Sequence, residues 1–600
     1  MNAEDTSKQM RHTKIPLPQA VVFYCAQFNI KHIVISPGSR NAPLTNGFVE
    51  NSYFTTYSIV DERAAAFFAL GIAQQHKYPV ALVCTSGSAL LNYYPAVAEA
   101  YYSEIPLVIL SADRMPHRVD IGDGQTIQQE GVFGPHLISA AALKPDVVHA
   151  TKSLLASNKQ TYFDSNPSKE DILVLQEKHQ KHNIAELQRI LSLACTSKGP
   201  VHLNIPMEEP LYEMTTRPLS FPKAAIIEKE TYNVDTAALL TAWKQASRKM
   251  ILIGVSSPDA ALNNTINQLL EDPSVVVLTE KTSNFTHPKA IDAIDCLMAP
   301  LELEQNNKEA GLKPDLLITV GGMVVSKKIK FYLRKHPAAQ HFHVDTTRAN
   351  DTFYYLTQHI EVPSNIGLEA VIKLPKTTSS YQENALKQYH AYLEKGKTYL
   401  KNIPFSDLAA FKRISCALPP NTHLQVANSS PIRYVQLFDL PKGTEIYSNR
   451  GTAGIDGSTA TAMGAAQINP KQPVLITGDL SFFYDINGLW HNYIPNNARI
   501  IIINNQGGGI FRILPGKKDS PKYDTYFETT HNRNARALAK NFGLQYKRVK
   551  TAWGLQRTLM SFFKGSNSAK ILEICTPRKN NDTVLLNYFR AMANKPNKES

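Results

Sequence analysis

The chain has 600 residues, of which 43% are hydrophobic and 19% are charged. This composition is typical of a globular protein and excludes a disordered or collagen-like chain, and at ~100–200 residues per domain the length suggests about three to five domains. The 64 basic and 51 acidic residues leave a net charge of +13, but no RGG tract, Cys/His finger or basic heptad accompanies this surplus, so we expect no nucleic-acid partner.

The six cysteines are scattered with no CxxC spacing, which indicates neither a disulfide framework nor a zinc site. The amino-terminal residues lack the apolar core of a signal peptide, and no apolar run approaches the ~18 residues that span a membrane. We therefore expect a cytoplasmic protein with reduced thiols and no membrane span.

Short runs of β-branched residues alternate with helix-length amphipathic segments along the whole chain. The runs are apolar throughout rather than at every second residue, so they predict parallel strands that helices cover on both faces. The predicted fold class is α/β. In chain order the predicted strands lie in residues 32–36, 57–61, 80–86, 106–113, 250–257, 275–280, 315–322, 473–479 and 499–505.

Two segments break this alternation. Residues 206–223 carry four prolines and no helical period, and residues 361–382 interrupt the pattern in a similar way. The polar residues 161–182 predict an exposed insertion or helix pair within the first domain. We predict three domains, each built on a doubly wound parallel sheet, over residues 1–212, 220–365 and 385–600.

Polar pairs follow two predicted strands of the third domain. Residues 473–479 end in Gly478-Asp479, and residues 499–505 end in Asn504-Asn505. The carboxyl ends of parallel strands meet at one edge of a sheet, where ligands bind. A carboxylate, an amide oxygen and a backbone carbonyl suit Mg²⁺, which phosphate oxygens and water complete. The pattern therefore predicts a metal–diphosphate site, with two ordinary strand-end turns as the alternative.

This pairing resembles the cofactor motif of thiamine-diphosphate (ThDP)-dependent enzymes. The resemblance implies that Asp479 and Asn505 bind Mg²⁺, or Mn²⁺ as an alternative, through their side chains, and that Gly507 binds it through its backbone carbonyl. It also implies that the first domain binds the pyrimidine ring, that the third binds the diphosphate, and that the middle domain is Rossmann-like.

A second motif lies in residues 57–73, where a strand is followed by Asp61 and an Ala-rich helix. Asp61 is well placed as the N-cap, which puts Glu62 in the first helical turn. An acid there also complements the helix dipole. In the ThDP family a glutamate at this place hydrogen-bonds the aminopyrimidine ring, so the resemblance implies that Glu62 is catalytic and shares a proton with the cofactor.

Longer segments narrow the resemblance. They are similar to those of the ThDP enzymes that decarboxylate 2-oxoglutarate and add the succinyl carbanion to isochorismate in menaquinone biosynthesis. The resemblance implies these two substrates and a homodimer or homotetramer in which each site joins two subunits, with Glu62 facing Asp479 of the partner subunit. The segments are residues 35–45, 85–116, 448–466, 478–489 and 504–515.

Both of these substrates carry carboxylates, which arginine binds through paired hydrogen bonds while staying charged. A single arginine is more often structural, but four of them fall inside the matching segments or beside them: Arg40, Arg114, Arg433 and Arg450. The resemblance adds Ser39, Gln125, Lys327, Lys328 and Ser429 as substrate contacts, Ile455 as the apolar support of a bent ThDP, and Ile510 and Phe511 as the lining of the reaction cavity.

The sequence departs from the family pattern at two places. Lys328 stands where the family has arginine, with a solvated lysine pair as the alternative, and Gly124 stands where the family commonly has asparagine. The chain has no His-His pair, which simple decarboxylases of the family use to protonate the carbanion, so carbon–carbon bond formation is favoured. The alternatives are another 2-oxo-acid carboligase or decarboxylase, such as an acetolactate-synthase-like enzyme using FAD and pyruvate, and a non-catalytic ThDP-binding protein.

Overall fold

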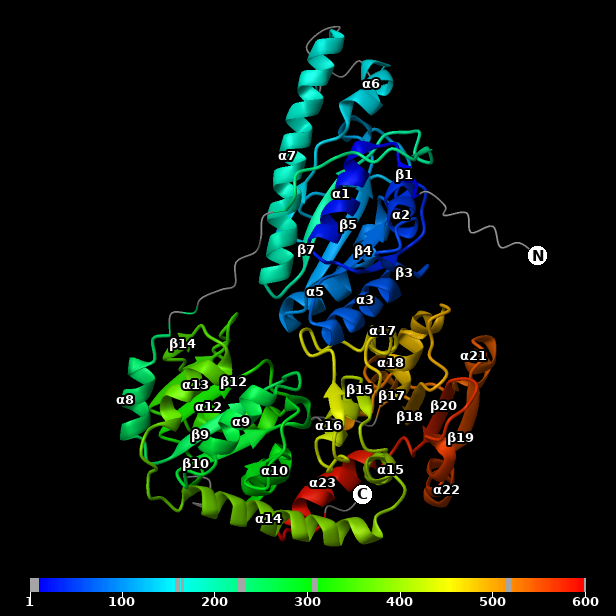
Figure 1. Cartoon of the computed structure of the whole chain (residues 1–600). Coiled ribbons are helices and arrows are strands. Elements are labelled where there is room, and N and C mark those ends of the chain that lie inside the picture. The colour runs from blue at the N-terminus through cyan, green and yellow to red at the C-terminus, as the bar shows by residue number, and fades with distance from the viewer. Residues whose placement is uncertain are drawn as a thin grey trace, which may run out of the picture. The chain divides into compact units, whose positions relative to one another are not determined.

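The computed structural model describes residues 10–156, 162, 167–224, 232, 234–304, 311–513 and 520–597. These residues form three six-stranded sheets whose neighbouring strands are all parallel (Figure 1). A separate antiparallel ribbon pairs β1 (His12–Thr13) with β8 (Met214–Thr215). The predicted α/β class is confirmed, and each predicted run overlaps a strand.

The chain forms two compact units. The first comprises the residues up to Lys229 together with Thr459–Pro470 and Asp485–Pro495, and the second comprises the remainder. Two short segments from the predicted third domain therefore belong to the unit that holds the first sheet.

The sheet of the first unit has the strand order β3-β2-β4-β5-β7-β6. Ile33, Val83 and Val108 share a core with α1 and α7, whereas α3 packs against β2, β4 and α5, so helices cover both faces. The elements are β2 (His32–Ile35), β3 (Thr55–Ser58), β4 (Val80–Cys84), β5 (Leu107–Asp113), β6 (Ser139–Ala142), β7 (Val201–Pro206), α1 (Pro16–Gln27), α2 (Ala42–Val49), α3 (Glu62–His76), α4 (Ser88–Asn92), α5 (Tyr94–Ser103), η1 (Pro116–Arg118), α6 (Val147–Ala156) and α7 (Lys169–Thr196).

Helix α3 also packs against α17 (Ser458–Ala465) through glycines. A Cβ atom on Gly71 would lie 2.1 Å from the Thr461 carbonyl oxygen, and one on Gly464 would lie 1.9 Å from that of Phe68. The two helix backbones are therefore so close that a residue with a side chain at either glycine would clash. This contact, with η4 (Ile486–Leu489), explains why the two short segments belong to the first unit.

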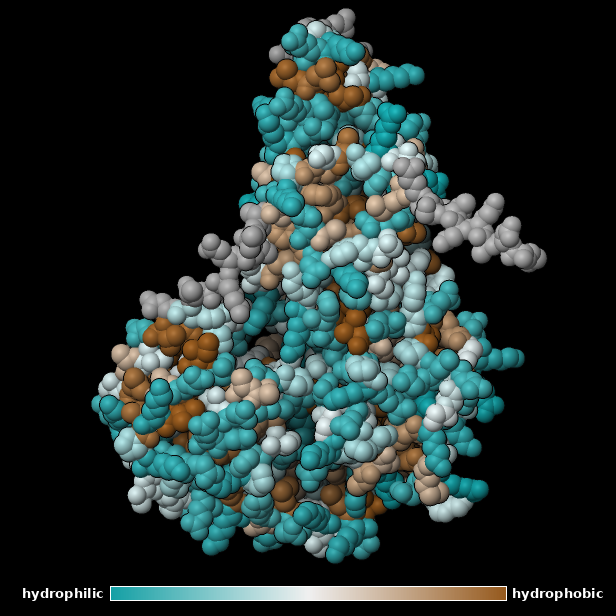
Figure 2. Space-filling model, in the orientation of Figure 1, coloured by the Kyte–Doolittle hydropathy of each residue, from teal (hydrophilic) through white to brown (hydrophobic). Residues whose placement is uncertain are grey.

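Part of the polar segment 161–182 lies in the long helix α7, which begins with a capping box between Ser168 and Asp171. Residues 161 and 163–166 lie outside the described residues. Helix α6 packs against α7, so this part of the first unit is a helix pair. Leu155 and Leu173 on these two helices are exposed, and Figure 2 shows apolar side chains toward the outer end of the pair.

The first sheet of the second unit has the order β11-β10-β9-β12-β13-β14. Strand order reverses between β9 and β12, where doubly wound sheets usually bind ligands. Here a Cβ on Gly254 would lie 1.9 Å from the Gly322 carbonyl oxygen, so backbone fills this point. The elements are α8 (Ala237–Gln245), β9 (Lys249–Ile253), α9 (Ala260–Leu269), β10 (Val275–Thr279), η2 (Lys281–Ser283), β11 (Ala290–Ile291), α10 (Ile294–Glu304), β12 (Leu316–Val320), α12 (Lys327–Lys335), β13 (Gln340–Val344) and β14 (Gln358–Ile360).

Residues 361–382 differ from the sequence prediction, because they include a helix, α13 (Ser364–Ile372). The helix buries Leu368 and Val371 and packs against α8 and α9. Pro363 stands immediately before it and Pro375 soon after it, so it is too short to show a clear helical period.

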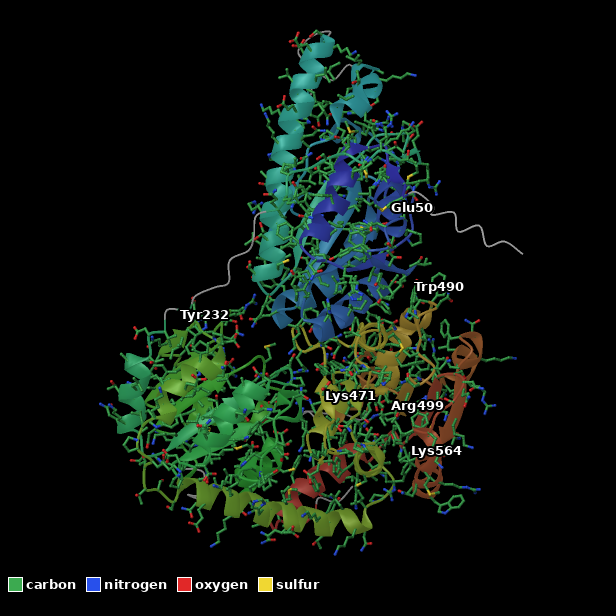
Figure 3. All side chains as sticks on the ribbon, viewed as in Figure 1. Glu50, Tyr232, Lys471, Trp490, Arg499 and Lys564 are labelled. Atoms are coloured by element: carbon green, nitrogen blue, oxygen red, sulfur yellow. The ribbon has the colours of Figure 1, made fainter. Side chains whose placement is uncertain are left out.

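The other sheet of the second unit has the order β16-β15-β17-β18-β20-β19. At the start of β18 the fully buried Arg499 donates to the carbonyl oxygens of Phe562 (2.7 Å) and Lys564 (2.5 Å), which fixes that end of the strand (Figure 3). The elements are α14 (Tyr381–Tyr399), η3 (Leu400–Asn402), α15 (Asp407–Ala417), β15 (His423–Val426), α16 (Ser430–Val435), β16 (Glu445–Tyr447), β17 (Pro473–Gly478), α18 (Asp479–Tyr484), β18 (Arg499–Asn504), α19 (Ile510–Ile513), α20 (Pro521–Tyr526), α21 (Arg536–Asn541), β19 (Gln545–Val549), α22 (Ala552–Phe562), β20 (Lys570–Cys575) and α23 (Asn581–Met592).

Within the described ranges, none of the helices combines the length and the apolar character needed to cross a membrane.

Candidate cofactor and substrate site

Glu62 is the first residue of α3, and the predicted cap at Asp61 is confirmed. The Asp61 carboxylate accepts the backbone N–H of Ala64 at 3.0 Å and the side-chain amide of Asn487 at 2.6 Å. One oxygen thus satisfies a helix N–H that would otherwise lack a partner, and the other ties the cap to η4. The helix start that carries Glu62 is therefore held from two sides.

The Glu62 carboxylate lies near the carboxyl end of β4. Burial raises the pKa of Cys84 and of Tyr93, and the negative charge of Glu62 raises both further. Glu62 itself is half-buried and makes no hydrogen bond or ion pair with any described side chain. Its carboxylate is therefore available to a ligand.

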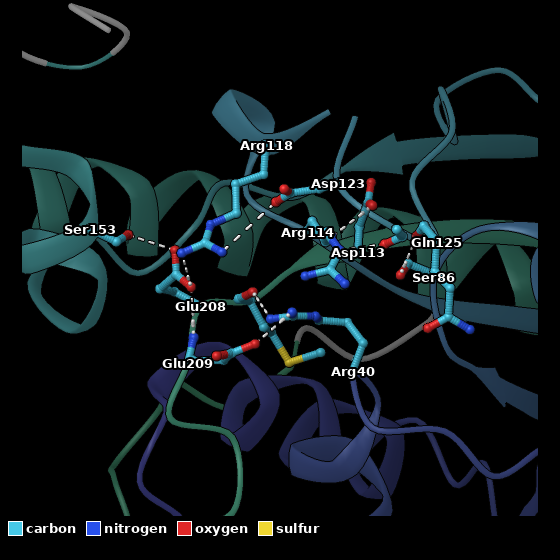
Figure 4. Close-up of polar contacts among 12 residues, drawn as sticks. Arg40, Ser86, Asp113, Arg114, Arg118, Asp123, Gln125, Ser153, Glu208 and Glu209 are labelled. Atoms are coloured by element: carbon cyan, nitrogen blue, oxygen red, sulfur yellow. Dashed lines mark hydrogen bonds and ion pairs between the residues drawn. The ribbon is translucent and has the colours of Figure 1, made fainter. Parts of the chain in front are cut away.

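Arg40 lies in a polar cluster of the first unit (Figure 4). Its side chain is 5% exposed and donates to the Met207 carbonyl oxygen (3.1 Å) and to the Glu209 carboxylate (3.0 Å). Burial and then the positive charge of Arg114 lower the pKa of Arg40, while Glu209 and Glu208 oppose this change. The structure thus brings two predicted substrate arginines close enough to repel each other.

The loop after β5 holds Arg114 and Gln125 (Figure 4). The Arg114 Nε atom donates to the Gly124 carbonyl oxygen (3.1 Å), and Ser86 donates to that of Gln125 (2.8 Å). The backbone of Gln125 is left-handed, with φ 57°, a conformation that costs energy and clusters at functional sites. Ser39, which precedes Arg40, is exposed.

Gln129 is a contributor that the sequence did not single out. It is buried, its side-chain oxygen accepts the Gly87 N–H (2.9 Å), and its nitrogen donates to Asn204 (2.7 Å). These bonds fix the Gln125 loop to β7 and to the turn after β4. Nothing local distinguishes Gln129 from a solvated loop glutamine.

In the second unit, Asp479 begins α18 directly after β17 and is 2% exposed. One carboxylate oxygen accepts the Gly507 N–H (3.0 Å) and lies 3.2 Å from His531 Nε2, and the other accepts the Leu480 N–H (2.7 Å). His531 Nδ1 accepts the Arg533 N–H (3.1 Å), and its Nε2 atom, although close to Asp479, makes no hydrogen bond with the described residues. Asp479 is thus held in place by donors from two segments.

Asn505 follows β18 and is also buried. Its amide nitrogen donates to the Asp407 carboxylate at 2.9 Å, so its amide oxygen points in another direction. Burial, with a smaller contribution from the charge of Asp479, raises the pKa of Asp407 to about 6, and hydrogen bonds from Thr576 and Asn505 oppose the rise. Sequence reasoning missed Asp407, which resembles any acid at the start of a helix.

The turn after Asn505 requires glycine. Gly507 has φ 149°, and a Cβ there would lie 2.5 Å from the Glu528 carbonyl oxygen; one on Gly509 would lie 2.8 Å from the Asn505 amide nitrogen. The Gly507 carbonyl accepts the Gly509 N–H at 3.0 Å, which leaves it a second lone pair. The carboxylate, amide oxygen and carbonyl form a donor set of the kind that Mg²⁺ prefers, so the residues fit the predicted metal.

Among the residues with described positions, no three or more His, Cys, Asp or Glu side chains are grouped so that they could hold a metal ion. The predicted set contains only one such residue, Asp479, so it is a different kind of site.

Asn428 connects the segments that carry Arg450 and Ile455. Its side-chain nitrogen donates to the carbonyl oxygens of Asn449 (2.6 Å) and Gly454 (2.7 Å), and its oxygen accepts from Arg450 (2.6 Å). Ile455 remains 38% exposed while its carbonyl accepts from Ser481 at 2.6 Å. A fixed backbone therefore presents an apolar side chain, as the support of a bent cofactor requires.

The predicted substrate residues Ser429 and Arg433 lie at α16. Ser429 precedes the helix with φ 72°, a strained backbone for a residue with a side chain. Arg433 is half-buried, and its Nε atom is enclosed without a hydrogen-bond partner among the described residues.

Lys330, one turn into α12, is a second cation near Arg433. Burial lowers the pKa of Lys330, and the charges of Arg450 and Arg433 lower it further, while Glu280 raises it. Lys330 makes no hydrogen bond or ion pair with the residues that the structure describes. Sequence reasoning missed it because it lies outside the Ser-Lys-Lys motif.

Glu280 is a buried acid of this region. It accepts the N–H groups of Val325 and Ser326, both at 2.7 Å. Burial raises its pKa to about 7 although these bonds oppose the rise. Glu280 thus fixes the start of α12, which carries Lys330.

The remaining predicted residues are less enclosed. Lys327 is exposed, and Lys328 pairs with Glu302 on α10 at 2.6 Å, which occupies the cation that replaces the family arginine. Ile510 and Phe511 lie in α19, and Phe511 is exposed, with its ring 6.3 Å from that of Phe527.

Two family models match parts of the chain. Residues 17–133 match the N-terminal TPP binding domain of thiamine pyrophosphate enzymes, and residues 429–573 match the C-terminal TPP binding domain. The chain belongs to the thiamine-diphosphate-dependent enzymes, and the predicted cofactor ThDP is confirmed.

Relatives that match over nearly the whole chain show to which branch of the ThDP-dependent enzymes it belongs. Proteins named 2-succinyl-5-enolpyruvyl-6-hydroxy-3-cyclohexene-1-carboxylate (SEPHCHC) synthase are 47% identical over 591 residues in Christiangramia forsetii and 48% identical over 588 residues in Flavobacterium psychrophilum, in each case over 97% of this chain and 100% of the relative. The protein of that name in Porphyromonas gingivalis is 35% identical over 93% of this chain and 94% of its own length. Within the ThDP-dependent enzymes, the chain belongs to the SEPHCHC synthase family.

Proposed function

We propose that the protein decarboxylates 2-oxoglutarate and adds the succinyl unit to isochorismate, giving SEPHCHC in menaquinone biosynthesis. The observation that carries the proposal is the pairing of functional groups in each unit. Glu62 shares the carboxyl edge of its sheet with Arg40 and Arg114. The other unit contains the turn at Asp479, which is hydrogen-bonded to the turn after Asn505. The same unit contains Arg433 and Arg450, whose charges both act on Lys330.

Glu62 is the group that exchanges a proton with the cofactor. Its helix start is fixed by Asp61, and its carboxylate has no partner among the described residues, so it can hydrogen-bond a ring nitrogen. When bound, ThDP would supply a nucleophilic carbon for the 2-oxo acid and an electron sink for its decarboxylation.

Asp479, Asn505 and the Gly507 carbonyl would hold Mg²⁺, with Mn²⁺ as an alternative, and the metal would bind the diphosphate. Ile455 would support the cofactor from its apolar side, and Ile510 and Phe511 would line the cavity. The buried carboxylate and the glycine turn support this assignment.

The arginines would bind the substrate carboxylates. Arg433 has an enclosed nitrogen without a described partner, and it would bind 2-oxoglutarate together with Ser429. Lys330 adds charge beside it. The first unit would contribute four further substrate contacts: Arg40, Arg114, Gln125 and Ser39. The pairing of Lys328 with Glu302 favours a structural role for Lys328, so Lys327 is the freer cation of the two.

We also propose a homodimer or dimer of dimers in which Glu62 acts with Asp479 of the partner subunit, and three functional domains over residues 1–212, 220–365 and 385–600. Each of these ranges contains one complete sheet. We place the protein in the cytoplasm, which its six free cysteines support.

The test is to incubate the protein with ThDP, Mg²⁺, 2-oxoglutarate and isochorismate and to detect SEPHCHC by mass spectrometry. Reactions without isochorismate, and with pyruvate in place of 2-oxoglutarate, are the controls. Carbon dioxide release without the adduct, or a preference for pyruvate with FAD, would assign a different carboligase or decarboxylase. ThDP binding with no turnover of any 2-oxo acid would assign a binding protein.

A further inference from the structure

Asp407, the first residue of α15, is a buried carboxylate that lies against the predicted metal site. It is 2% exposed. One oxygen accepts the Asn505 amide N–H at 2.9 Å, the other accepts the Thr576 hydroxyl at 2.6 Å, and its own N–H donates to Asn581 at 2.9 Å. Two segments distant in sequence, around Asn505 and over residues 576–581, therefore converge on this one residue.

The burial of this carboxylate costs free energy, which indicates that the residue has a role in the protein. A buried carboxylate is costly without a cation, and Asp407 forms no ion pair with any residue whose position is described. The nearby charge of Asp479 adds repulsion. Helix capping does not require the carboxylate either, because the hydroxyl of Ser406 already accepts the Ala409 N–H.

The carboxylate has one property that the site needs. An asparagine side chain has almost the same shape when its oxygen and nitrogen exchange places, yet only the oxygen can bind a cation. An ionised carboxylate can only accept hydrogen bonds, so Asp407 selects the orientation in which the Asn505 nitrogen faces it. The Asn505 oxygen is then turned away from Asp407.

We propose that Asp407 is a positioning residue for the metal: it holds the Asn505 amide so that its oxygen, and not its nitrogen, faces the cation. The proposal rests on the proposed function, in which Asn505 is a metal ligand. Asp407 does not touch the cation itself. Outer partners of metal ligands typically change metal affinity by about 10–100-fold when they are removed.

The main variant is Asp407→Leu, which keeps the approximate size and removes the acceptor. ThDP is held at a fixed concentration while Mg²⁺ is titrated into the metal-free protein, and binding is followed by intrinsic fluorescence and calorimetry. We expect the Mg²⁺ concentration for half-saturation to rise by about 10–100-fold. Circular dichroism and thermal unfolding of the metal-free protein show whether the variant folds.

Two further variants separate positioning from general stability. Asp407→Asn keeps an acceptor oxygen for Asn505 if the Thr576 hydroxyl reverses, so it should restore most of the Mg²⁺ affinity even where Asp407→Leu folds poorly. Thr576→Val removes the other hydrogen bond of the same carboxylate and should leave the Mg²⁺ titration close to that of the unaltered protein. If Thr576→Val weakens Mg²⁺ as much as Asp407→Leu does, or if Asp407→Asn is as weak, the proposal is overturned.

Asp479→Ala in the same titration distinguishes the positioning role of Asp407 from the assignment of the metal site. Loss of Mg²⁺ binding in Asp479→Ala with an unaltered titration in Asp407→Leu would overturn the positioning role and leave the proposed function intact. An unaltered titration in both variants, and in Asn505→Ala, would reject the metal assignment itself.

Discussion

Glu62 and the pair Asp479–Asn505 are held in opposite ways. Glu62 is a half-buried acid at the first turn of α3, and the residue immediately before it provides the cap. Asp479 and Asn505 are buried, and their partners Gly507, His531 and Asp407 come from other segments. Glu62 thus keeps a carboxylate without a partner among the described residues, as the proposed proton exchange requires, whereas the orientations of the proposed metal ligands are set by the protein itself.

The largest effect should follow from Glu62→Gln, which keeps the size of the side chain and removes the proton exchange. We expect kcat to fall by about 10²–10⁴-fold, the usual contribution of a general acid–base group, while Mg²⁺–ThDP binding stays near that of the unaltered protein. Steady-state kinetics and a ThDP titration measure the two. Glu50→Gln, at a partly exposed carboxylate labelled in Figure 3 that pairs with Arg11, is the control. Unchanged turnover in Glu62→Gln would reject the proton-exchange role.

Asp479→Ala should show the opposite profile, because it removes a proposed metal ligand and not the proposed proton carrier. We expect Mg²⁺-dependent ThDP affinity to drop by more than the about 10–100-fold typical of an outer partner, and activity to recover in part at high Mg²⁺ and ThDP. Calorimetry measures the affinity, with Asp439→Ala, at a side chain that is 98% exposed, as the control. A normal affinity for both ligands would contradict the assignment.

Arg433→Ala tests the cations of the second unit that are proposed to bind the substrate, Arg433 and the neighbouring Lys330 and Arg450. Removing a charge-assisted hydrogen bond costs about 1.5–3 kcal/mol, so kcat/KM for 2-oxoglutarate should fall by about 10–100-fold, and the residual activity on pyruvate, which lacks the distal carboxylate, should change much less. Arg413→Ala on α15 removes an arginine from the same unit and serves as the control. Equal losses on both 2-oxo acids would remove Arg433 from the dicarboxylate site.

Lys330→Met should give the smallest effect. A partly exposed charge contributes ~0.2–1 kcal/mol, so we expect KM for an anionic substrate to rise by about 1.5–5-fold with kcat little changed, and the effect to fade at high salt. Lys335→Met, at the exposed end of the same helix, is the comparison. Identical kinetics in the two variants would show that Lys330 does not serve the substrates.

Much of the fold was predictable because its strands are continuous apolar runs. Several strands that the sequence analysis missed carry polar residues: β13 contains His341 and His343, whose rings are each 2.9 Å from the Thr319 hydroxyl. Burial lowers the pKa of His341 to about 4, so it is neutral inside the sheet. The hydropathy pattern predicts that such residues are exposed, because their hydrogen-bond partner lies on a neighbouring strand and not in the local sequence.

The cofactor, the family and the cap at Asp61 could likewise be predicted from local motifs. Asp407 and Lys330 could not, since each looks ordinary in the sequence, and the proposed role of each depends on groups about a hundred residues away. Predicted roles for individual site residues, such as Lys327 and Phe511, stay predictions.

The sequence by itself determined which chemical groups stand at the ends of which strands, because apolar runs, caps and glycine turns are set by near neighbours. Only the tertiary structure decided which way the Asn505 amide is turned, which cations gather around Arg433, and that Lys328 is already paired. These properties depend on hydrogen bonds and charges between segments that only folding brings together.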